Sequence, residues 1–285
     1  MKFEIVEEYG NNFLKNLIIE SENLYALQYL IKEHTGKVDV ITIDPPYNTN
    51  IDYIEYKDSD FNGGWGNFIE QRLRLAYQLL SPKGVIFINI DENELASLLS
   101  ISYNIFGKNN VNILIWPKID SRFDQNRIEK PTINVKSTHE YIILCYKEKH
   151  NTIFQNTIDN KPLESIVAGY GTTSSAKDEI YGLLGSRDIF STPKPIPLIK
   201  ELIRVSSKQD SIVVDFFAGS GTAGHAVVAL NKEDEGKRRF ILITNNENNI
   251  CEKITVPRIK SAMQREQFDS GFTHIRMSSF EEVSK

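Results

Sequence analysis

The run Val38-Asp39-Val40-Ile41-Thr42-Ile43-Asp44-Pro45-Pro46-Tyr47 decides the fold. Its first six residues are mostly apolar and β-branched, which predicts a strand buried in a parallel sheet. The strand must end at Pro45 and Pro46, because proline has no backbone N–H to donate. The result is a stiff turn that carries the carboxylate of Asp44 and the ring of Tyr47. It lies at the carboxyl end of a strand, where open α/β sheets bind their ligands.

These groups suit the exocyclic amino group of a nucleobase. Such an amine is a poor nucleophile, because its lone pair is delocalised into the ring. Two acceptors, the carboxylate of Asp44 and a backbone carbonyl, can hold its hydrogens and turn the lone pair toward an electrophile. The ring of Tyr47 can stack on a base flipped out of the duplex. The alternative is an ordinary turn whose aspartate bonds its own backbone, since short motifs often match by chance.

Composition limits the class of protein. The chain has 285 residues, 40% of them hydrophobic and 25% charged, as expected for one large α/β domain or such a domain with a small appendage. Its start lacks the apolar segment of a secretory signal and no run is long enough to span a bilayer, so we expect a cytoplasmic protein without a membrane partner. With a net charge of −5, nucleic-acid binding would need a local basic patch.

The two cysteines, Cys145 and Cys251, lie in apolar or near-helical surroundings and are interpreted as buried thiols. His34, His150 and His274 form no metal-ligand spacing with them, so we expect no metal site.

Apolar strands and amphipathic helices alternate along the chain, the rhythm of a doubly wound sheet. The clearest strands are expected at 38–43, 85–90, 111–116, 139–146, 211–217, 239–244 and 271–277. Residues 1–20 are weakly patterned and predict a strand and a loop at the domain edge. Residues 151–190 show little periodicity and are interpreted as a long loop, which in a compact domain is usually functional or mobile.

A second motif follows the strand 211–217, where Ala218-Gly219-Ser220-Gly221-Thr222 leads into a helix. Gly219 and Gly221 let the backbone approach a ligand closely, and Ser220 or Thr222 can hydrogen-bond it. No Gly-Lys-Ser/Thr follows, so this is not a P-loop. A small cofactor without a pyrophosphate, such as S-adenosylmethionine, fits the motif better. The alternative is a tight turn that binds nothing.

Together the two motifs, in this order, resemble the β group of DNA amino-methyltransferases. The chain is similar to the modification (Mod) subunits of type III restriction–modification systems. Further matching runs are Asn23-Leu24, Ala26-Leu27, Arg72 to Leu80, Gly84 to Asp91, His139-Glu140-Tyr141, Lys194-Pro195 and Thr244 to Asn248. The resemblance implies an α/β fold: a doubly wound, mostly parallel, seven-stranded Rossmann-like sheet with helices on both faces. It also implies one methyltransferase domain over 1–285, with a catalytic half at about 20–150, a short target-recognition insert at about 117–190 and a cofactor half at about 191–285.

The resemblance further implies roles for individual residues. Asp44 and the Pro45 carbonyl would hold the target amine, Tyr47 would stack on the flipped adenine, and Pro46 completes the catalytic motif. The implied cofactor-binding residues are Asn23, Asp44, Lys194, Asp215, Phe217, Ala218, Gly219, Ser220, Gly221, Thr222, Asn245 and Glu247. The candidate nucleic-acid contacts are Asn48, Lys118, Arg122, Arg127, Lys130 and Lys136. No metal is implied, because the amine attacks a sulfonium directly.

The expected reaction is transfer of a methyl group from S-adenosylmethionine to adenine N6 in DNA. An RNA or cytosine-N4 methyltransferase is one alternative, and a non-catalytic methyltransferase-like subunit that binds nucleic acid is another. The insert at about 117–190 is short for reading a DNA sequence by itself. The strand ending at Thr244 lacks the usual acidic ribose ligand, for which Asn245 or Glu247 is the candidate. DNA is the expected partner, with a restriction subunit and a second copy of the chain as further candidates.

Overall fold

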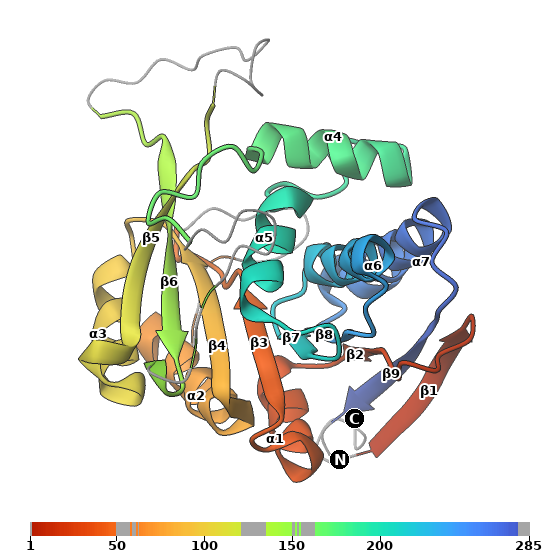
Figure 1. Ribbon diagram of the computed structural model, residues 1–285, viewed down its shortest axis with the longest axis horizontal. Helices are drawn as coiled ribbons and strands as arrows, with labels where there is room; N and C mark the ends of the chain where they lie inside the picture. Colours follow the sequence, from red (N-terminus) through yellow and green to blue (C-terminus); the bar gives the residue numbers. More distant parts are fainter. Residues whose placement is uncertain are drawn as a thin grey trace.

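The computed structural model describes residues 2–49, 58, 61, 63–120, 135–149, 152, 154 and 163–278. These residues form one nine-stranded sheet in the order β1-β9-β2-β8-β7-β3-β4-β6-β5 (Figure 1). The strands are β1 Lys2–Tyr9, β2 Leu17–Glu20, β3 Val38–Ile43, β4 Leu80–Ile90, β5 Val111–Pro117, β6 His139–Tyr146, β7 Ile212–Asp215, β8 Arg239–Thr244 and β9 Phe272–Ser278. The helices are α1 Asn23–His34, α2 Gly64–Leu79, α3 Leu95–Phe106, α4 Thr173–Leu184, α5 Ile196–Ser206, α6 Thr222–Asp234 and α7 Val256–Arg265.

The doubly wound, mostly parallel sheet is confirmed, but it has nine strands among the described residues rather than the predicted seven. Strands β9, β2, β8, β7, β3 and β4 run parallel, whereas β1, β6 and β5 join in antiparallel pairs. The two strands beyond these seven, β1 and β2, come from the first twenty residues, where one strand and a loop were expected at the domain edge; β1 is that edge strand, whereas β2 was not predicted. Four-residue β2 is too short to show a period, and β1 lies at the sheet edge with Phe3 and Ile5 exposed, so burial does not mark its pattern.

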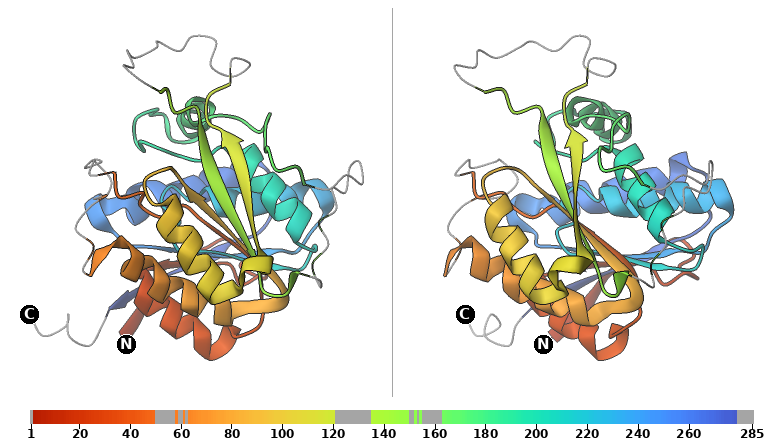
Figure 2. Two further views of the ribbon diagram at one scale, coloured as in Figure 1. Left: turned by 90° about the vertical axis from the view of Figure 1, so that its left-hand side faces the viewer. Right: turned by 60° about the vertical axis from the view of Figure 1, so that its left-hand side comes forward.

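Helices cover both faces of the sheet, with α1, α2 and α3 on one face and α5, α6 and α7 on the other (Figure 2). The alternation of side chains along β3 supplies both cores: Val40 packs in the cluster that contains α5 and α6, and Ile41 packs in the cluster that contains α1 and α2. A strand buried on both faces therefore appears as the continuous apolar run seen in the sequence. None of the described helices has the length and apolar character needed to cross a bilayer.

The interpretation of 151–190 as a loop was wrong for its second half, which contains α4. The side chain of Thr172 caps this helix by accepting the backbone N–H of Ser175, whose hydroxyl in turn accepts the backbone N–H of Thr172. Gly185, in the left-handed conformation, ends it. Only Ala176 and Ile180 are buried, so the helix has too narrow an apolar stripe to produce a clear period.

Strands β3 and β7 are neighbours, with Val40 paired to Val213 and Ile41 to Val214. From this pair the chain turns in opposite directions: β3 leads to α2 on one face, and β7 leads to α6 on the other. A crevice opens where two such crossovers diverge, at the carboxyl ends of the strands. The two motifs found in the sequence therefore meet at one position on the sheet edge.

Candidate functional site

A cavity of about 370 Å³ lies at the carboxyl ends of β3 and β7. This volume suits a small molecule. Among the predicted residues, the cavity is lined by Asn23, Asp44, Pro46, Lys194, Asp215, Phe217, Ala218, Gly219, Ser220, Thr222, Asn245 and Glu247. Three others, Pro45, Tyr47 and Gly221, are not part of its lining. The structure thus brings the catalytic and cofactor motifs to one cavity.

Asp44 is the centre of a charged cluster beside this cavity. Its Oδ2 lies 2.7 Å from Lys194 Nζ, and its Oδ1 accepts a hydrogen bond of 2.7 Å from the Tyr47 hydroxyl. Glu140, at the start of β6, joins the same groups: its Oε2 lies 3.1 Å from the Tyr47 hydroxyl and 3.4 Å from Lys194 Nζ. One ammonium is therefore held between two carboxylates.

Burial and charge set the protonation of this cluster. Burial raises the pKa of Asp44, and the Lys194 ammonium counteracts that rise. Burial alone would lower the pKa of Lys194, but the carboxylates of Asp44 and Glu140 outweigh it and raise that pKa. Burial and both carboxylates hold the pKa of Tyr47 well above its usual value, so its phenol keeps the proton that it donates.

The turn that carries Asp44 is fixed from several sides. The Trp65 indole, in the first turn of α2, donates to the Pro46 carbonyl at 2.6 Å. The carboxylate of Asp58 accepts the backbone N–H groups of Asn48 and Thr49, each at 2.9 Å. These bonds explain how two prolines and a residue at φ 59° (Asn48) hold one conformation. Asp44 is thereby placed before any ligand arrives.

The glycine turn uses its glycines as the sequence predicts. Gly219 has φ 47° and Gly221 has φ 81°, a region that disfavours residues with a Cβ. A Cβ at Gly219 would lie 3.1 Å from the ring of Phe190, which lines the same cavity. The buried Arg258 of α7 supports the turn from behind, since its Nη1 donates to Ser220 Oγ at 2.7 Å and to Thr222 Oγ1 at 2.9 Å.

Asp215, the last residue of β7, is a buried acid in the cavity wall. Its Oδ1 accepts the backbone N–H of Phe217 at 2.9 Å. Burial, together with the nearby charge of Asp44, raises the pKa of Asp215 to about 8. A polar ligand that donates hydrogen bonds to this buried carboxyl group would stabilise its ionised form.

Asn23, expected to reach a cofactor, also holds the wall together. Its Nδ2 donates to the Phe216 carbonyl at 2.9 Å, and its Oδ1 accepts a hydrogen bond from Arg72 of α2. Among the aromatic residues of the wall, the sequence analysis named Phe217 as a site residue but not Phe61 or Phe68. Phe61 lies 4.8 Å from Phe68, and Phe68 lies 5.9 Å from Phe217, measured between ring centroids. The many aromatics at 48–66 were the available signal.

The candidate nucleic-acid contacts are only partly gathered. Lys118 Nζ lies 3.5 Å from Glu140 Oε1, next to the Asp44 cluster. The Asn48 side chain donates to Glu94 Oε1 at 2.7 Å, and Lys136 is exposed. Three of the predicted residues lie outside the described residues: Arg122, Arg127 and Lys130. The basic patch therefore stays a prediction.

Comparison with known proteins places the chain within a described family. A family model described as DNA methylase, of the N6/N4 methyltransferase type, matches residues 38–255. The StyLTI type III restriction-modification Mod subunit of Salmonella typhimurium is 29% identical, over 80% of this chain and 52% of the relative. The EcoPI Mod subunit of Escherichia phage P1 is 25% identical, over 83% and 58%. The chain thus spans about half the length of these two relatives. The type II methyltransferase M.KpnI of Klebsiella pneumoniae is 25% identical, over 84% of this chain and 85% of the relative.

Solved structures share the fold. The cytosine-N4-specific PvuII DNA methyltransferase has a TM-score of 0.58 at 12% identity, covering 94% of this chain and 98% of that one. The M1.HpyAVI complex with S-adenosylmethionine (SAM) has a TM-score of 0.55 at 18% identity, covering 87% and 98%. At such low identity these similarities establish the arrangement of strands and helices rather than the chemistry.

Proposed function

Because the chain belongs to the N6/N4 DNA methylase family, we propose that it transfers a methyl group from S-adenosylmethionine to the N6 amino group of adenine in DNA. One observation carries the proposal: the Asp44 carboxylate lines the same cavity as the glycine turn Ala218–Thr222. An acceptor for an amine and a cradle for a methyl donor then share one space. Neither motif alone would support more than the binding of some polar ligand.

The cavity fits the cofactor by its chemistry. When bound, S-adenosylmethionine supplies an electrophilic methyl carbon on a sulfonium. The missing Cβ at Gly219 lets a ligand approach the backbone closely, and Asp215 offers a buried acid to hydrogen-bond donors. Asn245 and Glu247, just beyond β8, line the cavity and would supply acceptors for the ribose hydroxyls. The aromatic wall of Phe61, Phe68 and Phe217 provides apolar area for a purine ring.

The target amine must compete with Lys194 for Asp44. Lys194 Nζ donates to Asp44 Oδ2 at 2.7 Å. The same nitrogen is already 3.4 Å from Glu140 Oε2, so a small shift lets Glu140 keep the ammonium while Oδ2 accepts the amine. Tyr47 continues to hold Oδ1 and fixes the carboxylate plane. Glu140 thereby acts as the positioning residue that makes Asp44 available.

One feature supports adenine over cytosine, though the fold serves both bases. The aspartate at position 44 resembles the form of the motif used mostly for adenine N6.

The Mod subunits among the relatives lead us to propose a restriction subunit as a partner of this chain. Because 117–190 is short, we propose that recognition of a DNA site draws on that partner or on a second copy of the chain. We propose that the described catalytic and cofactor halves form one methyltransferase domain.

The test is a labelling experiment. The protein is incubated with S-adenosylmethionine labelled in its methyl group, separately with duplex DNA, with RNA and with no acceptor, and the modified base is identified after digestion. N6-methyladenine in DNA is expected. N4-methylcytosine in DNA would identify cytosine rather than adenine as the target base. Label in RNA alone would refute DNA as the substrate, and cofactor binding without any transfer would favour a non-catalytic subunit.

A further inference from the structure

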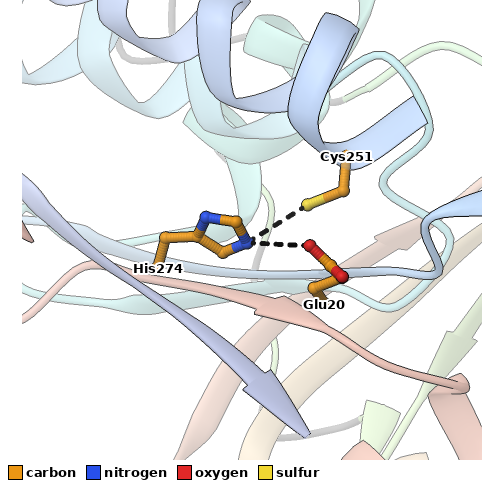
Figure 3. A group of neighbouring side chains, drawn as sticks. All are labelled: Glu20, Cys251 and His274. Carbon is orange, nitrogen blue, oxygen red and sulfur yellow. Dashed lines mark hydrogen bonds and ion pairs between the residues drawn. The ribbon is translucent and has the colours of Figure 1, made fainter. Parts of the chain in front are cut away.

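Three buried side chains that the proposed reaction does not use meet beside the cofactor cavity. They are Glu20, Cys251 and His274, and Figure 3 shows them pointing toward one another. Glu20 ends β2, His274 lies in β9, and Cys251 begins the π-helical turn Cys251–Thr255 ahead of α7. Glu20 is 6% exposed, His274 is 2% exposed and Cys251 is fully buried. A carboxylate, an imidazole and a thiol thus share a volume shielded from water.

The sheet register produces this meeting. In the parallel pair β2–β9, Ile18 stands opposite His274 and Glu20 opposite Arg276. Residues two apart on a strand share a face, so the side chains of Glu20 and His274 both project toward the turn that carries Cys251. Along the chain the three residues lie far apart, and no spacing rule would group them.

The distances match the edges of a tetrahedral metal site. His274 Nε2 lies 3.5 Å from Cys251 Sγ and 3.3 Å from Glu20 Oε2. Zinc binds N and O at about 2.1 Å and S at about 2.3 Å, so tetrahedral edges are about 3.6 Å for N–S and about 3.4 Å for N–O. All three donor atoms lie within 4.8 Å of one another, so a rotation of the Glu20 carboxylate can close the third edge.

Hydrogen bonding accounts less well for the same arrangement. Nε2 carries at most one proton, yet it faces both the thiol sulfur and the carboxylate oxygen. Its 3.3 Å distance to Glu20 is longer than the ~2.7–2.9 Å of a charge-assisted bond.

We propose that Glu20, Cys251 and His274 form a binding site for Zn²⁺, with a fourth position left to water. Sulfur, nitrogen and oxygen donors together suit this ion. Arg276 also bonds the Glu20 carboxylate and orients it, as outer partners of metal ligands do. Since this arginine already compensates the charge of Glu20, the cluster can also exist without metal. Binding displaces the thiol proton of Cys251, so the affinity rises with pH.

The position of the site links it to the cofactor cavity. Ser21 directly follows Glu20, and Ile250 directly precedes Cys251; both line that cavity. An ion would therefore tie β2 and β9 to the turn at 247–255, which forms one rim of the cavity. We expect zinc to fix this rim and to change the affinity for S-adenosylmethionine. The metal itself plays no part in methyl transfer.

The experiment measures metal binding directly, without DNA or cofactor, so its outcome does not depend on the proposed function. Chelator-treated protein is titrated with Zn²⁺ by calorimetry and with Co²⁺ by absorption spectroscopy. One ion per chain is expected, with the charge-transfer band of a cobalt–thiolate bond. Cys251→Ser and His274→Ala should each weaken Zn²⁺ binding at least tenfold. Cys145→Ser, which alters the buried thiol of β6, is the matched control and should bind as the wild type does.

A second readout covers variants that fold poorly. Melting temperatures are measured with and without Zn²⁺, and only the wild type and Cys145→Ser should rise. Folded wild-type protein that binds Co²⁺ without a thiolate band, or that binds no ion, would overturn the proposal. Equal affinities in the Cys251→Ser, His274→Ala and Cys145→Ser variants would overturn it as well.

Discussion

Replacement of Lys194 by Met tests how the protein keeps Asp44 ready to accept the target amine. Methionine has a similar length and lacks the charge, so the substitution removes the ammonium and little volume. In the wild type, that ammonium lies 2.7 Å from Asp44 and 3.4 Å from Glu140, and the lysine side chain is 7% exposed. The variant therefore leaves two carboxylates together without their shared cation.

The magnitude follows from these distances. An opposite charge this close lowers the pKa of a carboxyl by about 1–3. Its removal should raise the pKa of Asp44 by about that amount, in addition to the rise that burial already causes. A protonated Asp44 is a poorer acceptor of the amine hydrogens. The acidic limb of the pH profile of methyl transfer should therefore move about 1–3 pH units upward. Breaking the pair should also cost about 3 kcal/mol of stability, the lower end for buried pairs, because the Asp44 side chain is 28% exposed.

The assay is single-turnover methyl transfer to DNA between pH 5 and 9, at saturating S-adenosylmethionine. Lys194→Arg keeps the charge and should retain the wild-type limb at a reduced rate. Lys200→Met is the matched control, because Lys200 lies in the neighbouring helix α5 and pairs with Glu233 away from the cavity. If the acidic limb of the pH–rate profile of folded Lys194→Met coincides with that of Lys200→Met, the Lys194 charge does not control the ionisation of Asp44. A change in cofactor KM alone would assign Lys194 to the cofactor instead.

Three further predictions concern the cavity and the glycine turn beside it. Asp44→Ala should reduce transfer below detection while the protein still folds, with its stability lowered by about 3 kcal/mol because Lys194 loses its partner, and exposed Asp210→Ala should change neither transfer nor stability; measurable transfer by Asp44→Ala would remove Asp44 from the mechanism. The pKa of Asp215 is about 8 in the folded protein, against an ordinary value of 3.8, so the native state binds the extra proton and its stability falls as pH rises through that window. Asp215→Asn should remove this loss. Its free energy of unfolding in urea should rise relative to that of the wild type by at least about 1.4 kcal/mol between pH 5 and pH 8.5, and a constant difference between the two proteins would contradict the prediction. Gly221→Ala and Gly185→Ala both place a side chain at positive φ and should each cost about 1–2 kcal/mol, but only the first should weaken cofactor binding in a titration.

Much of the sheet edge at the cavity could be predicted from the conformational preferences of a few adjacent residues. Alternating burial on two faces makes β3 a continuous apolar run, and two prolines without N–H groups end it directly after Asp44. The strand β7 with Asp215, followed by glycines at positive φ, is equally local, since each conformation depends on a few adjacent residues. For the same reason the parallel α/β class was predicted correctly, whereas the four-residue β2 and the narrow apolar stripe of α4 were not.

The long-range partners were decided by tertiary structure alone. Glu140 reaches Tyr47 across 93 positions, Lys194 reaches Asp44 across 150, and Arg258 supports Ser220 from another helix. His274 meets Glu20 only because β9 pairs with β2. The sequence by itself determined which residues could accept an amine and cradle a cofactor. Which charges surround Asp44, and therefore how it ionises, depended on strand order and register, which bring together side chains that no local pattern connects.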